Sequence, residues 1–492
     1  MSRPLSQAGF FFLLALSLRA GEFDTLVDRF FDQAYFRFHP TEATSAGFHE
    51  YDNRLEDYSR ASIRAETAAL KRFLGDFQKF PSEPDCDLVI ARIRARLLDL
   101  ETIRMWEKNP DSYSGGITNS VFVIMSRSFA PAPTRLEALI ARERQIPGVL
   151  AAARANLKNP PRIYTEIALE QLPGIVKFFE KDVPAAFQSV TQARLLRDFE
   201  AANRGVIEAL TQYQSFLRDR LLPQSNGDFR IGGDAFRQKL LFEEMVDTPL
   251  DRLLEIGYQD LRRNQAALRG AAARIDSRRE PRAVLGDLER DGPAPGKLLQ
   301  AFRDVLGVLR EFIQTRNIVT IPSPVPPILQ ETPPFMRALT FASMDTPGPY
   351  ETMAKEAFFN VTLPEPDWSP QRIAEHMAGF NRGTVISTAI HEAYPGHYTQ
   401  FLWVQRASSK TRRLLGCGTN SEGWAHYAEQ MMLDEGYGKG DLKLRLGQIQ
   451  DALLRNGRYI AGIQMHTGKM TYEQGVDFFM KEGFQSRANA ER

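Results

Sequence analysis

Apolar residues recur every three to four positions along most of the chain, with charged and polar residues between them. This spacing is typical of amphipathic α-helices, which bury one face and expose the other. It predicts helices over residues 23–38, 58–80, 86–108, 136–157, 164–180, 191–221, 249–275 and 295–315. Residues 109–135 contain more Ser, Gly and Pro, so we expect an irregular connection there.

The pattern changes between about residues 317 and 365, where short β-branched and aromatic runs are separated by prolines. Residues 318–321, 337–341 and 358–362 are therefore expected to form short strands. Residues 383–390 come just after this region and are predicted to form a buried helix. The expected fold class is mainly α: a large multi-helix domain with a cleft, and a small β element ahead of that helix.

The N-terminus carries the features of a secretory signal peptide. An apolar run, Phe10–Leu18, follows Arg3 and is followed by the small residue Ala20. A basic start, an apolar stretch and a small-residue exit are the parts of such a peptide. Residues 1–20 are therefore expected to be removed, and the mature protein to be periplasmic or secreted. A buried N-terminal helix is the alternative.

The rest of the sequence bears on the domain organisation, the partners and the cysteines of the protein. Residues 21–492 are expected to form one catalytic domain, with a possible sub-lobe boundary in the glycine-rich stretch 225–235. The net charge of +1 gives no chain-wide field that favours nucleic acid. No later apolar run approaches the roughly 20 residues that span a bilayer, so no stable membrane insertion is expected after signal removal. Cys86 and Cys417 could pair in an oxidising compartment, which the sequence leaves open.

The stretch from His391 to His397 reads HEAYPGH and carries the candidate chemistry. Imidazole is the commonest protein ligand of zinc, and a Glu beside a ligating His often serves as general base. On a regular helix, however, positions i and i+6 lie about 240° round, so the two rings would project about 120° apart. A distortion at Pro395-Gly396 could bring them together. The alternative is a helix that ends at Pro-Gly and carries two unrelated histidines.

A third metal ligand is expected on a nearby segment, and Glu422 is the candidate. Glu422, His426 and Glu429 stand at i, i+4 and i+7, which places one polar stripe on an otherwise apolar segment. The competing interpretation is a capping box, because Thr419 precedes Glu422 by three residues. Farther along, Arg458 and Tyr459 could bind a substrate carboxylate or simply pack.

HEAYPGH followed by SEGWAHYAE resembles the bacterial family catalogued as domain of unknown function 885 (DUF885), which is grouped with zincin-type metallopeptidases. The resemblance runs from about residue 25 to the end. It implies a zincin-like helical fold with a cleft, and one zinc ion (or another divalent metal) per chain. It implies His391, His397 and Glu422 as metal ligands and Glu392 as general base.

The same resemblance bears on three further positions. His466 matches a family histidine and is a candidate for oxyanion stabilisation, with a plain surface or core histidine as the alternative. Tyr398 stands where family members often carry a second His. Family members usually continue beyond the position of Arg492, with a segment that looks like part of the substrate site.

The resulting hypothesis is a zinc metallopeptidase that cleaves peptides or small amides with a metal-activated water. The ligands and the base have the roles given above, and His426, Glu429, Tyr398, Arg458 and Tyr459 are expected to support the ligands or contact substrate. One alternative is a metal-dependent amidohydrolase or esterase that acts on a non-peptide substrate. Another is a catalytically inactive binding protein on the same scaffold. Substrate identity, exo- or endo-cleavage, the physiological metal and the oligomeric state stay open.

Overall fold

The computed structural model describes residues 21–337 and 340–491, so the expected signal peptide lies outside the described residues. The chain divides into two compact units. Unit 1 contains the chain up to Asn226 together with Gly348–Met353 and Ala407–Leu415. Unit 2 contains Gly227–Pro347, Ala354–Arg406 and the chain from Gly416 onward. Every residue of the HEAYPGH and SEGWAHYAE stretches belongs to unit 2.

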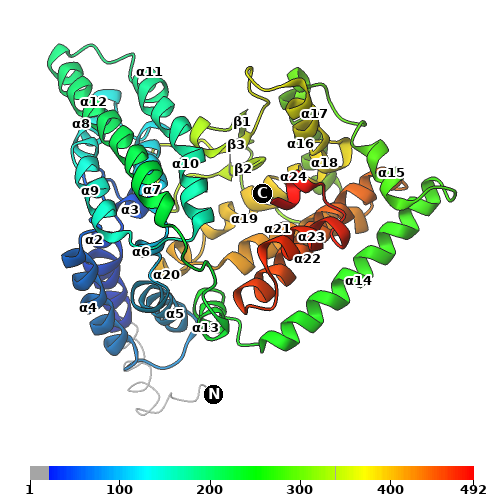
Figure 1. Cartoon of the computed structure of the whole chain (residues 1–492), viewed down its shortest axis with the longest axis horizontal. Helices are drawn as coiled ribbons and strands as arrows, with labels where there is room; N and C mark the ends of the chain where they lie inside the picture. Colours follow the sequence, from blue (N-terminus) through cyan, green and yellow to red (C-terminus); the bar gives the residue numbers. More distant parts are fainter. Residues whose placement is uncertain (1–20, 338–339, 492) are drawn as a thin grey trace, which may run out of the picture. The chain divides into compact units, whose positions relative to one another are not determined.

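Unit 1 is built from helices, as the period of its apolar residues predicts (Figure 1). After a helix over residues 21–30, its α-helices are α2 (Phe36–Phe38), α3 (Pro40–Ala46), α4 (Arg60–Phe77), α5 (Pro84–Leu98), α6 (Met105–Lys108), α7 (Asp111–Met125), α8 (Ala132–Glu143), α9 (Ile146–Asn156), α10 (Arg162–Lys177), α11 (Val183–Ala186), α12 (Ala193–Phe216) and α20 (Lys410–Leu414). Short π-helical turns, η1 (Phe31–Tyr35), η3 (Asp99–Ile103), η4 (Phe178–Asp182) and η5 (Leu217–Leu221), and 3₁₀ turns, η2 (His49–Tyr51) and η6 (Leu222–Gln224), join or extend them.

The irregular connection expected over residues 109–135 is wrong, because α7 fills most of it. Apolar residues recur at helical spacing through this helix, and Tyr113, Ile117 and Val121 are buried. Thr118 and Ser120 do not interrupt the helix, since their hydroxyls donate to carbonyls of the same helix; Thr118 Oγ1 lies 2.7 Å from the Ser114 carbonyl oxygen. Packing of this apolar face outweighs the weak helix propensity of the small residues.

Unit 2 combines helices with one small sheet (Figure 1). Its helices are α13 (Gly233–Glu243), α14 (Leu250–Ile275), α15 (Pro281–Leu288), α16 (Leu298–Arg316), α17 (Pro370–Ala378), α18 (Arg382–Glu392), α19 (His397–Val404), α21 (Gly418–Asp434), α22 (Leu442–His466), α23 (Tyr472–Lys481) and α24 (Arg487–Glu491), with 3₁₀ turns η7 (Pro295–Lys297) and η8 (Pro334–Met336). Its strands are β1 (Ile328–Glu331), β2 (Ala342–Asp345) and β3 (Phe358–Val361).

The sheet has the order β1-β3-β2, so β3 is central and β2 is an edge strand. β1 runs parallel to β3, with Ile328 opposite Phe358. β2 runs antiparallel to β3, with Ala342 opposite Val361. The expected position of the third strand is confirmed, whereas the second begins after the predicted range 337–341.

The strand expected at 318–321 is wrong. Ile318 instead donates its N–H to the carbonyl of Ile313 and closes the end of α16, and its side chain packs against the apolar core of unit 2. The first strand forms ten residues later, at β1. A short apolar run can either pack in the core or form a strand, and its position relative to β3 decides whether it pairs in the sheet.

The helix predicted over 383–390 is confirmed as α18, which is almost wholly buried. The Asn381 side chain caps it by accepting from the Thr384 N–H. The backbones of α18 and α22 meet where Gly383 faces Gly447, since a Cβ added to Gly447 would lie 2.8 Å from the Gly383 carbonyl carbon. This close approach fixes α18 against α22 near its start, and the last turn of α18 carries His391 and Glu392.

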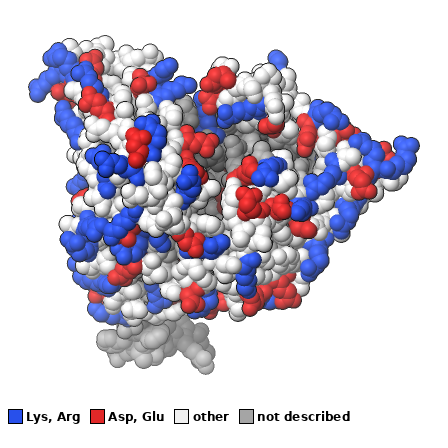
Figure 2. Space-filling view, in the orientation of Figure 1, with Lys and Arg blue, Asp and Glu red and all other residues white. Residues whose placement is uncertain are grey.

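Three further expectations can be compared with the described residues. Lys and Arg side chains are interspersed with Asp and Glu over the face in Figure 2, in keeping with the small net charge. No helix in the described ranges combines the length and the apolar composition that crossing a membrane requires. Cys86 and Cys417 are both free thiols.

Candidate metal centre

The backbone turns sharply between α18 and α19. α18 ends at Glu392 and α19 begins at His397, and the Tyr394–Pro395 peptide bond is cis. The Gly396 N–H donates to the carbonyl of Ile390 over 2.9 Å, which folds the chain back onto the end of α18. A Cβ at Gly396 would lie only 1.8 Å from the carbonyl oxygen of His391, so only glycine fits this position.

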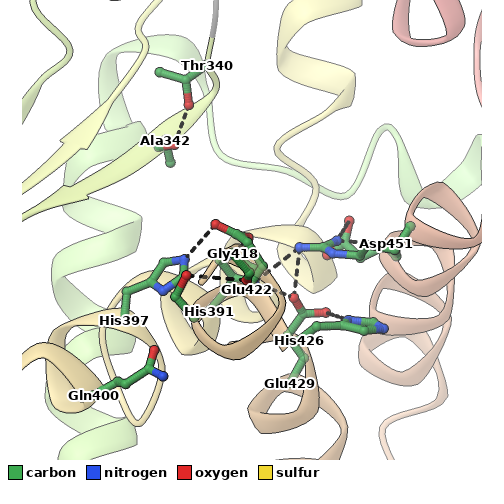
Figure 3. Close-up of polar contacts among 12 residues, drawn as sticks. Thr340, Ala342, His391, His397, Gln400, Gly418, Glu422, His426, Glu429 and Asp451 are labelled. Atoms are coloured by element: carbon green, nitrogen blue, oxygen red, sulfur yellow. Dashed lines mark hydrogen bonds and ion pairs between the residues drawn. The ribbon is translucent and has the colours of Figure 1, made fainter. Parts of the chain in front are cut away.

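The turn brings the two histidines of HEAYPGH together with Glu422 (Figure 3). The rings of His391 and His397 stand nearly perpendicular, with their centroids 4.7 Å apart. Nε2 of each ring lies 3.4 Å from a different oxygen of Glu422. Metal–ligand bonds of about 2.0–2.2 Å in a tetrahedral site place ligand atoms roughly 3–4 Å apart. The predicted break in the helix and the predicted convergence of these atoms are confirmed.

Glu422 reaches this point from α21, which begins at Gly418. The N-cap residue of α21 is Cys417, and no side chain caps the helix there. Thr419 uses its backbone N–H to bind a carboxylate oxygen of Glu244, so the capping-box interpretation of Glu422 is wrong. The Glu422 side chain is 67% exposed, which leaves its oxygens free to face the cavity.

A buried carboxylate orients His391. Oε1 of Glu429, a fully buried side chain, lies 2.8 Å from Nδ1 of His391. Because a carboxylate only accepts, Nδ1 carries a hydrogen and Nε2 is the nitrogen turned toward Glu422. Arg455 donates to the same Glu429 oxygen over 2.9 Å, and His426 Nδ1 lies 3.3 Å from the other. Glu429 is therefore held on three sides, and the His391 ring is fixed with it.

Packing holds the second histidine. The ring of His397 stacks on Phe401, one turn later in α19, with centroids 5.4 Å apart and planes inclined by 2°. Its Nδ1 is buried and makes no hydrogen bond to any described residue. Nε2 is thus the nitrogen of His397 that faces the shared point.

The electrostatics of the cluster favour a positive charge. Burial opposes protonation of His391, but Glu422 and Glu429 outweigh it and raise the pKa of His391 to about 9. The two histidines lower the pKa of Glu422. Burial alone would raise the pKa of Glu429, but Arg455, His391 and His426 together lower it to about 2. The negative charge of the two carboxylates thus stabilises a positive charge at His391.

Glu392 faces the same cavity without joining the converging atoms. It is 8% exposed, and burial raises the pKa of its carboxyl group against the opposing pull of His391 and His397. A carboxylate with a raised pKa beside a candidate metal point has the properties of a general base.

The cavity around these groups, called the site cavity below, has a volume of about 820 Å³ and lies entirely within unit 2. Residues 340–344, which include the first three residues of β2, form one wall. α18, α19 and α21 supply the histidines and Glu422. The opposite wall is a face of α22 that carries Asp451, Leu454, Arg455 and Arg458.

His426, Glu429 and Arg458 line the site cavity as the sequence predicts, but the structure does not bring His466, Tyr398 or Tyr459 to it. The His466 ring stacks on Phe236 and accepts from the Ile231 N–H, two turns beyond Arg458 on α22. Tyr398 is buried and donates its hydroxyl to the Val325 carbonyl over 2.6 Å.

Helix geometry explains the two tyrosines. Each follows a cavity residue by one position, which turns its side chain about 100° away. Tyr459 accordingly leaves the cavity face of α22 and lies against Gly257 of α14, where an added Cβ would meet its ring at 2.7 Å.

Three residues of the site were missed by sequence reasoning. Arg455 binds Glu429, Asp451 lies 4.0 Å from Arg455, and Phe401 stacks on His397. A signal exists for the first two, because charged residues at 451, 455 and 458 stand at i, i+4 and i+7 and so share one face of the helix. The sequence gives no such signal for Phe401, since an aromatic residue at that spacing is equally common in an apolar core.

Comparison with known proteins agrees with this architecture. Residues 40–492 match the family described as "Bacterial protein of unknown function (DUF885)". The chain belongs to the DUF885 family. The expected family and the expected mainly helical fold with a small sheet are thereby confirmed. No curated protein matches this DUF885 chain.

Two solved structures share the fold. One, from Shewanella oneidensis, is described as a candidate lipoprotein of unknown function; it is 27% identical, the match covers 95% of this chain and 87% of that one, and the TM-score is 0.74. The other, a candidate lipoprotein from Colwellia psychrerythraea, is 15% identical, with the same two coverages of 95% and 87% and a TM-score of 0.75. At that identity the second likeness concerns the fold alone.

Proposed function

We propose that this DUF885 protein is a metal-dependent hydrolase, most simply a zinc metallopeptidase that cleaves peptide or small amide bonds. The observation that carries the proposal is the convergence of His391, His397 and Glu422 within 4.8 Å, with Glu392 on the same cavity. Stability alone does not require four titratable side chains to face one another, and such groupings are characteristic of catalytic sites.

The residues present fit a zinc-class ion. Two imidazole nitrogens and one carboxylate oxygen are a donor set of hydrolytic zinc sites, which keep a further position open. His391, His397 and Glu422 would hold one ion per chain, and another divalent metal with the same ligand preference would suit the same donors. When bound, such an ion supplies Lewis acidity for the scissile carbonyl and for a water molecule.

Other side chains of the site transfer the proton and hold the two histidines in position. Glu392 accepts a proton from the attacking water and delivers it to the leaving amine, a transfer helped by its raised pKa. Glu429 and Arg455 keep the His391 ring in one orientation. Phe401 does the same for His397 by stacking.

The edge strand β2 supports a peptide as the substrate. Phe341 and Thr362 form a hydrogen-bonded pair, in which the Thr362 N–H donates to the Phe341 carbonyl over 2.8 Å. Antiparallel pairs alternate, so Ala342 and Met344 direct their backbone groups away from β3; the Ala342 carbonyl accepts from the Thr340 hydroxyl, and the N–H groups of both residues and the Met344 carbonyl are left for a peptide. Both residues line the site cavity. An extended peptide can pair with such an edge, whereas a compact non-peptide substrate gains nothing from it.

We also propose that the protein works outside the cytoplasm. The Shewanella structure is described as a candidate lipoprotein, a class that is exported, and the sequence at 1–20 has the features of a signal peptide. A peptide or small amide in the periplasm or outside the cell would then be the substrate.

Metal analysis followed by a substrate panel tests the function. Purified protein should carry or take up about one zinc-class ion per chain, and the loaded protein should hydrolyse peptides. Hydrolysis of esters or non-peptide amides alone would favour the amidohydrolase or esterase alternative. Metal binding without hydrolysis of any substrate would favour a binding protein on the same scaffold.

A further inference from the structure

The carboxylates of the site cavity already have partners or are shielded. Glu422 faces two histidines, and Glu429 is bound by two histidines and by Arg455. Asp451 lies beside the same guanidinium. Glu392 is buried, and burial raises its pKa. The guanidinium of Arg455 is therefore paired with carboxylates of the site and is not available to bind a ligand.

Arg458 is different. It lies one turn after Leu454 and three residues after Arg455, on the face of α22 that forms a wall of the site cavity. Its side chain is exposed, and Glu422 and Asp451 attract its guanidinium only across the cavity, without a hydrogen bond or ion pair to any described residue. A guanidinium presents parallel N–H donors that match the two oxygens of a carboxylate. The cavity thus offers one uncommitted cation with a geometry suited to a carboxylate.

We propose that Arg458 binds the α-carboxylate of the C-terminal residue of a peptide, so that the enzyme releases single residues from peptide C-termini. The proposal rests on the hydrolytic function given above and names its substrate class. The reaction consumes one water: the C–N bond before the last residue breaks, the water oxygen joins the acyl carbon, and the proton taken by Glu392 passes to the new amino group. The products are a shortened peptide and a free amino acid.

The surroundings of Arg458 favour an α-carboxylate over an acidic side chain. Leu454 precedes Arg458 by four residues, so the two side chains are neighbours on one helix face. Met344 and Phe401 add further apolar surface to the cavity wall. A carboxylate and an apolar side chain on the same residue occur together only at the C-terminus of a peptide. If Arg458 bound an Asp or Glu side chain instead, that residue would have no hydrocarbon side chain to place against this apolar wall.

Three matched substrates separate the sources of the carboxylate. Benzoylglycyl-phenylalanine carries an α-carboxylate, its C-terminal amide carries none, and benzoylglycyl-glutamate α-amide carries only a side-chain carboxylate. We expect the zinc-loaded protein to prefer the first over the second by about 10- to 100-fold in kcat/KM, as for a charge-assisted contact. Equal turnover of acid and amide overturns the proposal. Preference for the glutamate α-amide overturns the α-carboxylate assignment.

Variants connect this preference to one side chain. Arg458→Gln should raise KM for the free acid by about 10- to 100-fold, with little effect on kcat and none on the amide. Arg458→Lys keeps the charge without the paired donors and should fall between. Arg445→Gln removes the same charge from α22 at a half-buried position outside the cavity, and should leave both substrates unaffected. Zinc content of each variant is measured alongside, and an Arg458 effect that follows zinc loss overturns the proposal.

A binding measurement separates this proposal from the hydrolytic function. Calorimetry with acetylphenylalanine and with its amide reports binding without turnover. Binding of the acid but not the amide, lost in Arg458→Gln, supports the carboxylate site even if no peptide is cleaved, in which case the hydrolytic function fails alone. If peptides are cleaved but the acid and the amide bind equally, the hydrolytic function stands and the role of Arg458 is wrong.

Discussion

The α-carbon of Gly396 lies so close to the carbonyl oxygen of His391 that a Cβ would stand 1.8 Å from it. This contact turns α18 into α19 and brings His397 back beside His391. Two histidine side chains that a regular helix would hold about 120° apart therefore face one point. The geometry of the site depends on a position that carries no functional group.

Gly396→Ala should consequently disturb the metal site. We expect zinc affinity to fall by about 10- to 100-fold, the range found when a ligand's support is removed, because the backbone must shift and move His397. Competition with a chelator measures the affinity. Gly462→Ala is the matched control, since a Cβ there meets nothing within 4 Å and alanine favours the helix. Unchanged affinity in Gly396→Ala would mean that the turn adjusts without moving His397.

Removal of a ligand gives a second prediction. His391→Ala, His397→Ala and Glu422→Ala should each weaken zinc binding by on the order of 100-fold or more, because each takes away one of the converging donors. Equilibrium dialysis with metal analysis provides the measurement. Glu435→Ala, an exposed change at the end of the same helix as Glu422, should leave zinc content unchanged. Full zinc content in any of the three variants would remove that residue from the set.

Much of this site could be predicted from the sequence. The residue types and their spacing pointed to the proposed ligands and base, because chemistry restricts which side chains can fill those roles. The helix break at Pro395-Gly396 followed from the geometry of an i, i+6 pair. The predicted helices of unit 1 were also largely correct, since their apolar period extends over many residues.

The errors share a cause. Arg455 contacts Glu429 across 26 positions of sequence, and no local pattern encodes such a partner. Resemblance supplied His466, whose ring the structure instead packs on Phe236. The small residues of α7 looked like a loop because propensity was weighed without the packing that overrides it. Local pattern therefore predicts elements and residue types, whereas tertiary partners decide placement.

Glu392→Gln tests the general base. The substitution keeps the shape of the side chain and removes its ability to accept a proton. Zinc content should be retained, and hydrolysis should fall by roughly 10²- to 10⁴-fold. Stopped assays on zinc-matched wild type and variant give the comparison. Turnover equal to wild type at equal zinc content would remove Glu392 from the mechanism.

Export gives a prediction about the mature chain. The apolar run Phe10–Leu18, bounded by Arg3 and Ala20, should direct removal of the first residues. N-terminal sequencing of protein recovered from its native cell should begin at or near Gly21. Recovery of the chain with Met1 intact would contradict it.

Unit 1 contains a carboxyl group that makes stability depend on pH. Glu143, at the end of α8, is fully buried, and neither carboxyl oxygen has a hydrogen-bond partner among the described residues. Burial raises the pKa of Glu143 to about 9, from 4.5 when exposed. The folded chain therefore keeps this proton between those two pH values, while the unfolded chain has lost it. Since the unfolded state binds fewer protons there, stability should fall as pH rises, by up to about 1.4 kcal/mol per pH unit.

Glu143→Gln should remove this dependence, because the amide stays neutral at every pH. The free energy of opening of α8, measured by hydrogen exchange of its amides, should fall between pH 5 and about 9 in the wild type and fall less in the variant. The two proteins should be similar near pH 4.5, and the variant should be the more stable at pH 8. Glu137→Gln changes an exposed residue on the same helix and should follow the wild type. Parallel curves for wild type and Glu143→Gln would mean that the carboxylate of Glu143 finds solvent or a partner when it ionises.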